Sequence, residues 1–214
     1  MKATKIVAVA TAMMFAVRAD AHRLDELLQA VQVHLFANHV ELEVTLTPGV
    51  NLASTFFSSA DRDGNGSVSP AEAERFAARW LEKVTLTIDG TAVQPRIASA
   101  TFPPLQDLSG GEGIVRISLR SPDAALRGGH HQLSIRNDNE PDASIYLENA
   151  VIPIDKRIVI ATQRRNTTQS MYTVDYDVAS PLSWLSPSWL FVAAGAVLLL
   201  LLQNRLRGSA ESST

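Results

Sequence analysis

The segments Val31-Gln32-Val33-His34-Leu35 and Val40-Glu41-Leu42-Glu43-Val44-Thr45-Leu46 alternate apolar and polar side chains, and Ala37-Asn38 offers a turn between them. Because successive side chains of a strand point to opposite faces, this alternation predicts an antiparallel hairpin with one buried face. With the turn at residues 37–38, His34 lies opposite Glu41, and we expect an ordinary cross-strand ion pair between them. The hairpin predicts a two-faced β architecture for the body of the chain.

Further short segments with the same alternation follow along the chain, separated by Gly, Pro, Asn and Asp. The Asp89-Gly90 dipeptide is typical of a two-residue hairpin turn, because both residues tolerate positive φ. About eight short strands at this spacing predict a mainly β fold, an antiparallel β-sandwich, over residues 22–180. The additional predicted strands are residues 84–88, 114–120, 131–136, 144–147, 157–161 and 171–178.

The apolar period changes from two to that of a helix within residues 50–83. We expect a short helix over residues 51–60, a loop, and a second helix over residues 70–82, so that a helix-loop-helix is inserted into the sandwich. The second helix carries an apolar stripe that would pack on the body of the protein. Its members are Phe76, Ala77, Trp80 and Leu81.

The loop between these helices has oxygen-bearing residues at the spacing of a twelve-residue calcium loop, residues 61–72. Ca²⁺ is a hard cation that takes six to eight oxygen ligands in flexible geometry. Gly66 stands at the sixth position, where the chain must reverse sharply, and Val68 is the apolar residue that would pack the loop against the fold. The expected metal ligands are Asp61, Asp63, Asn65, Ser67 (through its carbonyl), Ser69 (directly or through water) and Glu72.

A second interpretation of the same residues needs no ion. Ser69-Pro70-Ala71-Glu72 is also a helix capping box with proline at the first helical position. Capping alone, however, does not require acidic or amide side chains at residues 61, 63 and 65, nor glycine at residue 66. We therefore expect calcium to bind.

The loop resembles the EF-hand calcium-binding family, over about thirty-five residues with its flanking helices. More loosely, Ala21-His22-Arg23-Leu24-Asp25-Glu26 and Thr168-Gln169-Ser170-Met171-Tyr172 resemble segments of uncharacterised exported bacterial proteins. Some of those carry an EF-hand, and some are the outer domain of nickel-permease-like membrane proteins. This wider resemblance covers most of the body and implies no established activity.

EF-hands usually occur in pairs, and the sequence contains no second such loop. A single loop implies weak binding, in the ~10⁻⁴–10⁻³ M range of extracellular modules, and a structural role for the ion. The alternative is a calcium switch that exposes an apolar groove beside Phe56, Phe57 and Trp80.

The beginning of the chain is typical of a secretory signal peptide, residues 1–21. Lys2 and Lys5 precede an apolar run, and an A-x-A site that ends at Ala21 predicts cleavage before His22.

Near the other end, residues 184–203 form an apolar run that predicts a transmembrane helix. Its unbroken apolar part and flanks extend about 28 Å at a rise of about 1.5 Å per residue, enough to span a bilayer core. Trp184 and Trp189 suit the membrane interface, and two arginines follow the run. We expect a single-pass protein of a bacterial cell membrane, with its N-terminal domain in the periplasm and residues 204–214 as a cytoplasmic tail.

Composition excludes several classes of function. The 214 residues include no cysteine, which excludes a disulfide scaffold, a thiolate metal site and a cysteine nucleophile. The formal net charge of −3 and the absence of a basic block argue against nucleic-acid binding. No G-x-S-x-G, H-E-x-x-H or phosphate-binding glycine loop is present, so we do not expect an enzyme.

The acidic run at residues 137–142 is predicted to be a strand connection, with a second calcium site as the alternative.

The histidines allow a different metal chemistry. Cleavage would leave His22 as the new N-terminus, whose amine and imidazole together could chelate nickel or copper. The alternative function is thus a nickel- or copper-handling accessory of a membrane transporter, and a weaker one is a copper-dependent oxidase. His130 and His131 are adjacent on a predicted strand, so they would point to opposite faces and could not chelate one ion together. The candidates for a second ligand are His34, His39, His130 and His131.

Overall fold

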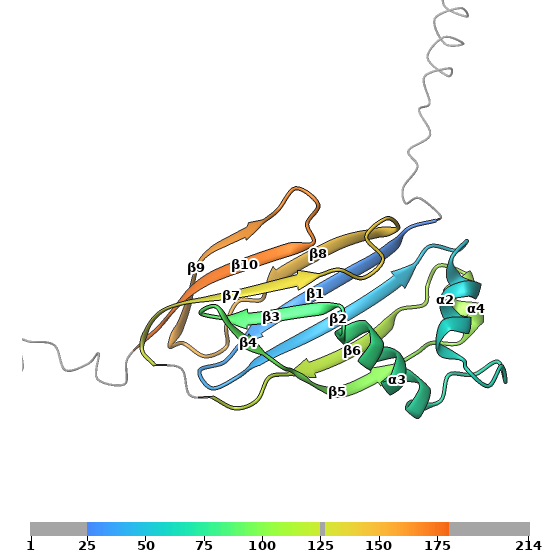
Figure 1. Ribbon diagram of the computed structural model, residues 1–214, viewed down its shortest axis with the longest axis horizontal. Helices are drawn as coiled ribbons and strands as arrows, with labels where there is room; N and C mark the ends of the chain where they lie inside the picture. Colours follow the sequence, from blue (N-terminus) through green and yellow to red (C-terminus); the bar gives the residue numbers. More distant parts are fainter. Residues whose placement is uncertain (1–24, 125–126, 180–214) are drawn as a thin grey trace, which may run out of the picture.

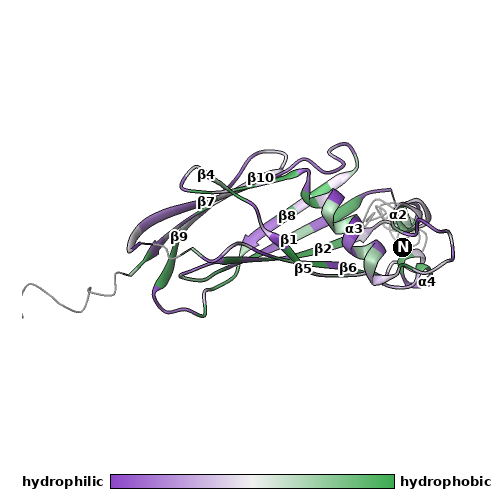
Figure 2. Ribbon diagram, turned by 60° about the horizontal axis from the view of Figure 1, so that its bottom comes forward, coloured by the Kyte–Doolittle hydropathy of each residue, from purple (hydrophilic) through white to green (hydrophobic). Residues whose placement is uncertain are grey.

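A computed structural model describes residues 25–124 and 127–179 of the chain (Figure 1). These residues form a mainly β structure with two five-stranded sheets and few helices, an arrangement consistent with the predicted sandwich. The two sheets form two layers in Figure 2. In chain order the elements are β1 (Leu27–Leu35), β2 (Val40–Pro48), α2 (Ala53–Ala60), α3 (Pro70–Leu81), β3 (Val84–Ile88), β4 (Thr91–Val93), β5 (Arg96–Thr101), α4 (Leu105–Ser109), β6 (Val115–Arg120), β7 (Gly129–Asn137), β8 (Ser144–Ala150), β9 (Ile158–Arg165) and β10 (Met171–Val178).

The first sheet has the strand order β5-β6-β2-β1-β8, and the second has the order β4-β3-β7-β10-β9. The predicted hairpin is confirmed as the β1–β2 pair, which places His34 opposite Glu41. One pair departs from the predicted antiparallel pattern: β8 runs parallel to β1, with Leu27 beside Ser144. The two strands begin side by side, with Leu27 N–H donating to the Ala143 carbonyl at 2.7 Å, so they run in the same direction.

The core between the sheets comes from the apolar phase of each alternating strand. Val33, Val44 and Ile117 on the first sheet and Leu133 and Val174 on the second have no exposed surface. Burying such side chains contributes about 1.5–3 kcal/mol each relative to leaving them in water. The alternation seen in the sequence is therefore the source of the core.

The expected ion pair between His34 and Glu41 does not form, although their register is as predicted. The Glu41 carboxylate instead bonds to His39 Nε2 at 3.1 Å and to Arg120 Nη1 at 3.0 Å. Arg120 comes from β6, which pairs with the other side of β2. The guanidinium therefore reaches Glu41 from a strand distant in the sequence.

Two strands and one helix are absent from the prediction. β5 (Arg-Ile-Ala-Ser-Ala-Thr) has one large apolar residue, Ile97, and a register shift between Ile97 and Ser99, so its sequence shows no clear alternation. β4 has only three residues, and α4 has only five. Each of these elements is stabilised by the elements that it contacts, and no local sequence pattern marks it.

The helices gather at one end of the sandwich, and the last described residue lies toward the other end (Figure 1). The start of β1 lies at the helical end, where Gly49 N–H donates to the Glu26 carbonyl at 2.8 Å. At the opposite end, Ala179 N–H donates to the Arg157 carbonyl at 2.7 Å. The described part of the chain thus begins and ends at opposite ends of the body.

Within residues 25–124 and 127–179, no helix is long and apolar enough to cross a membrane. The predicted signal peptide, residues 1–21, and the predicted span, residues 184–203, lie outside the described residues.

Glu148 is an ionisable residue of the core. It lies on β8, has no exposed surface, and neither carboxylate oxygen has a hydrogen-bond partner among the described residues. Burial raises its pKa to about 7, although the charge of Arg165 acts in the opposite direction. The carboxyl group therefore prefers its neutral form in the folded protein.

Replacing Glu148 with glutamine should flatten the pH dependence of stability. The folded state holds this proton more tightly than the unfolded state does, since the pKa is about 7 instead of the ordinary 4.5. Glu148 therefore contributes about 3 kcal/mol of stability that is lost as the pH rises from about 4 to about 8. Denaturant unfolding across this range should show a change in stability that differs between the wild type and Glu148→Gln by about this amount.

Glu43→Gln is the matched control for that prediction. Glu43 is exposed on β2 and bonds to the Ser118 hydroxyl at 3.0 Å, so its substitution should leave the wild-type pH slope in place. Parallel pH curves for the wild type and Glu148→Gln would contradict the shifted pKa.

Candidate metal centre

The loop that joins α2 and α3 is ordered by its own side chains. The Asp61 carboxylate accepts N–H bonds from Gly64 at 3.0 Å, Asn65 at 3.2 Å and Gly66 at 2.9 Å. Gly64 and Gly66 have φ of 69° and 82°, a left-handed conformation that glycine adopts without steric cost. The chain reverses at the position where the sequence predicts a reversal.

The next two expected ligands bond to each other within this turn. The Asp63 carboxylate accepts the Asn65 N–H at 3.1 Å and the Asn65 side-chain amide at 2.8 Å. The Asn65 side-chain oxygen, Oδ1, accepts the Ser67 N–H at 2.8 Å. These contacts keep the side chains of residues 61, 63 and 65 on the inside of the loop.

Glu72 closes the loop from the first turn of α3. Its Oε1 accepts the Arg62 N–H at 2.9 Å, and its Oε2 accepts the Ser69 N–H at 3.0 Å and the Ser69 hydroxyl at 2.7 Å. The residue is only 3% exposed. These bonds, the Ser69 hydroxyl first among them, lower the pKa of Glu72 to about 2. The carboxylate is therefore fully ionised near neutral pH.

Three carboxylates converge as a result. Asp61, Asp63 and Glu72 each place an oxygen within 4.8 Å of the other two, and this is the sole group of three or more His, Asp or Glu residues with metal-binding geometry in the described part of the chain. Carboxylate oxygens are the ligands that Ca²⁺ prefers. The side chains of Asn65 and Ser69 lie beside the group, bonded to Asp63 and Glu72.

The capping box is also formed. The Ser69 hydroxyl accepts the Glu72 N–H, and the Glu72 carboxylate accepts the Ser69 N–H, with Pro70 at the first helical position. Capping and metal binding thus use the same two residues in the same conformation. The cap does not involve Asp61 or Asp63, whose segment reaches Glu72 through the Arg62 and Asp63 N–H groups that donate to Glu72 Oε1.

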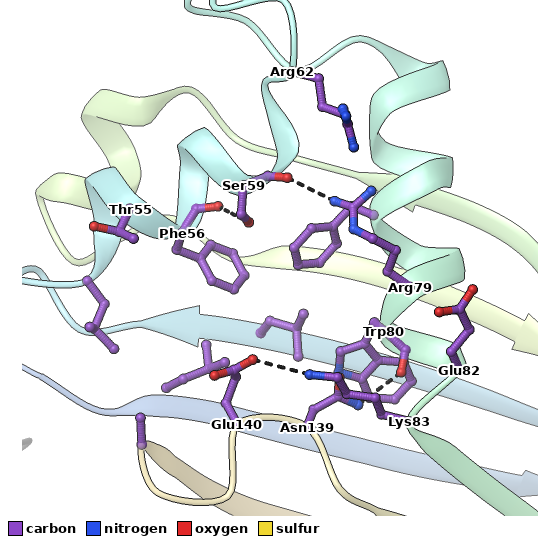
Figure 3. Close-up of a pocket in the computed structure, with 15 residues that line it drawn as sticks. Thr55, Phe56, Ser59, Arg62, Arg79, Trp80, Glu82, Lys83, Asn139 and Glu140 are labelled. Atoms are coloured by element: carbon purple, nitrogen blue, oxygen red, sulfur yellow. Dashed lines mark hydrogen bonds and ion pairs between the residues drawn. The ribbon is translucent and has the colours of Figure 1, made fainter.

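Behind the loop, α3 is attached to both sheets by a buried network of amide groups. Gln29 Oε1 on β1 accepts the Trp80 indole N–H at 2.9 Å and the Asn137 amide N–H at 3.1 Å. Gln29 Nε2 donates to the Asn139 carbonyl at 3.0 Å, and Asn139 Nδ2 donates to the Trp80 carbonyl at 2.9 Å (Figure 3). Tyr146 O–H donates to the Asn139 carbonyl at 2.6 Å. We call these five residues the amide network.

Residues 137–142 contribute two side chains to the amide network. As predicted, they connect two strands, β7 and β8. Asn137 and Asn139 are almost fully buried, and their amides bond to Gln29, to Trp80 and to each other. Both amides are therefore engaged inside the protein, and a second calcium site in this run stays a prediction. Gln29 was not among the predicted residues, although it is a polar residue at a position of β1 where the alternation places apolar ones.

A groove of about 550 Å³ lies between the two helices and the sheet (Figure 3). Phe56 packs edge-on against Phe76 with 5.3 Å between ring centroids, and both line the groove with Trp80. A groove beside Phe56 and Trp80 is thus open in this structure, whereas a calcium switch that exposes it stays a prediction. Phe57, which was expected there, is instead 3% exposed and belongs to the core.

The described histidines do not converge on one another. His39 stacks on Phe36 and bonds to Glu41, while His34 lies on β1 in register with Glu41. His130 bonds to Asp177 at 3.2 Å and His131 to Asp89 at 2.7 Å, on opposite faces of β7 as predicted. His22 lies outside the described residues, so nickel or copper binding there stays a prediction.

Comparisons of the chain with protein-family models, curated proteins and solved structures found no match. The function must therefore be argued from the geometry of the loop and from the sequence.

Replacing Gln29 with leucine should destabilise the protein by about 3 kcal/mol, because the Trp80 and Asn137 N–H groups would lose their shared buried acceptor. Urea unfolding measures this change. Gln32→Leu is the control, since Gln32 lies on the same strand but is exposed, and its substitution should change stability by less than about 0.5 kcal/mol. Equal effects of the two substitutions would mean that the amide network is not a main source of stability.

Proposed function

We propose that this protein is a membrane-anchored extracytoplasmic module that binds one calcium ion through an EF-hand-like loop, residues 61–72. The observation that carries the proposal is the convergence of Asp61, Asp63 and Glu72 in a loop with oxygen donors at all the expected positions. Three carboxylates this close repel one another, and a divalent cation would relieve the repulsion. Calcium suits the site because the donors are hard oxygen atoms.

The contacts around the loop favour a structural role for the ion. Arg79 Nη2 on α3 donates to the Ser59 carbonyl on α2 at 2.8 Å, and the Phe56–Phe76 contact joins the same two helices. The amide network holds the far end of α3 to both sheets. Since these contacts join the helices without an ion, calcium would stiffen the loop and not open the helix pair.

The anchoring part of the proposal rests on residues 1–21 and 184–203, the expected signal peptide and span. The described chain stops at residue 179, at the end of the sandwich opposite the helices (Figure 1). A span that begins at residue 184 would therefore hold the calcium loop at the membrane-distal end. There it would be accessible to a partner, such as a membrane transporter or another envelope protein.

Calcium titration of the purified full chain in detergent tests the binding. We expect one site with a Kd of about 10⁻⁴–10⁻³ M. At a calcium concentration ten times the Kd, binding should add about 1.4 kcal/mol to the free energy of unfolding and raise the melting temperature by about 3–5 °C. Asp61→Asn combined with Glu72→Gln should abolish both effects, because it removes two of the three converging carboxylates.

Glu74→Gln is the matched control for the titration, since Glu74 is exposed on α3 outside the ligand set. It should bind calcium as the wild type does. Unchanged calcium binding by the double variant would refute the proposed site and leave the loop as a capped turn.

Membrane fractionation tests the anchor. The full chain should stay with membranes through an alkaline carbonate wash, and its mature N-terminus should be His22. A chain that lacks residues 184–203 should be soluble in the periplasm, whereas one that lacks only residues 208–214 should still pellet. A full chain released by carbonate would contradict the span.

A further inference from the structure

The connection between β8 and β9, residues 151–157, lies at the end of the sandwich where the described chain stops (Figure 1). The link is direct, because Ala179 N–H, just after β10, donates to the Arg157 carbonyl at 2.7 Å. This connection and the exit of the chain toward residues 184–203 are therefore neighbours.

This connection exposes apolar side chains, whereas a surface loop usually exposes polar ones. Val151, Pro153 and Asp155 are half-buried, while Ile152 is 87% exposed and Ile154 is 85% exposed. Both isoleucine side chains thus face the solvent. Val159, at the start of β9, is 61% exposed and extends the apolar surface. Loop residues facing water are ordinarily polar, so two such isoleucines indicate an apolar partner.

Local hydrogen bonds hold this segment in place. Val151 N–H donates to the Val33 carbonyl at 2.9 Å, which attaches the segment to β1. The Asp155 carboxylate accepts from Arg157 Nη2 at 2.7 Å, and the Asp155 carbonyl accepts the Ile158 N–H at 3.0 Å. The isoleucines are therefore presented outward by an anchored backbone and do not fold back on the core.

We propose that Ile152 and Ile154 insert into the surface of the lipid bilayer. The argument for lipid is proximity: the apolar run begins at residue 184, and the five residues after Ala179 extend at most about 18 Å. The bilayer is thus the apolar phase within reach of this end. Two exposed isoleucines beside the basic Lys156 have the character of an interfacial contact. The proposal rests on the span proposed above and is independent of calcium.

Such a contact would give the molecule a second attachment to the membrane. With the chain exit alone, only the four residues 180–183 would connect the sandwich to the span. With the isoleucines inserted next to the exit, its long axis would stand away from the membrane, and the helical end would point outward.

A single-cysteine scan tests the contact cleanly, because the natural chain has no cysteine. The full chains Ile152→Cys and Ser58→Cys are labelled with the environment-sensitive fluorophore NBD and reconstituted in vesicles of phosphatidylcholine and phosphatidylglycerol. Ser58 is the control because it is exposed on α2, at the opposite end of the body. We expect a blue-shifted emission at position 152 and quenching by shallow doxyl-labelled lipids about twofold or more greater than at position 58.

A second variant checks that the two isoleucines act together. Ile154→Ser in the Ile152→Cys chain should return the emission toward that of an aqueous probe, while Leu147→Ser, on the exposed face of β8, should not. Both substitutions replace an exposed side chain, so folding should be retained in each.

The outcomes separate the contact from the span. Equal quenching at positions 152 and 58 in a chain that floats with the vesicles would overturn the contact and leave the span intact. A chain that does not float would overturn both. A blue shift at position 152 without lipid quenching, together with disulfide crosslinking between two unlabelled copies of the Ile152→Cys chain, would place a second copy of the chain on these residues and overturn the lipid proposal.

Discussion

The hydrogen bonds of the Gln29 side chain are the constraint on which the rest of the structure depends. A buried amide has to satisfy both its donor and its acceptor, and Gln29 does so with Trp80 of the helical insert and with Asn137 and Asn139 of the second sheet and its connection. One side chain of the first sheet thereby aligns the insert and both layers. Apolar packing would tolerate small displacements of these parts, whereas hydrogen bonds at 2.9–3.1 Å do not.

This constraint extends through α3 to the acidic loop of residues 61–72. The helix is attached near its C-terminal end through Trp80 and capped at its N-terminal end by Ser69 and Glu72, so the Glu72 carboxylate lies on a fixed element. Asp61 and Asp63 approach it from a loop that is closed by hydrogen bonds to its own backbone. A proposed ion would therefore meet one ligand on a helix and two ligands on a loop. That arrangement suits a cation which accepts flexible geometry.

The molecule also has two different ends. The helical end holds the acidic loop, the apolar groove and the start of β1, whereas the other end holds the exposed isoleucines and the last described residue. Between them the core contains the Glu148 carboxyl group, which has no hydrogen-bond partner among the described residues and which burial favours in its neutral form. The proposed calcium function and the proposed lipid contact thus belong to opposite ends of one body.

The sequence by itself determined the elements whose cause is local. Alternation predicted β1, β2 and most other strands, and the order of residues 61–72 predicted the turn and the cap, because each depends on neighbours within a few positions. The parallel β1–β8 pair, the contacts of Glu41 with Arg120, and the amide network were decided only by the tertiary structure. Gln29 and Asn137 are 108 positions apart, and no periodicity in the chain relates residues so distant. Their pairing follows from how two sheets stack, a property of the whole fold and of no single segment.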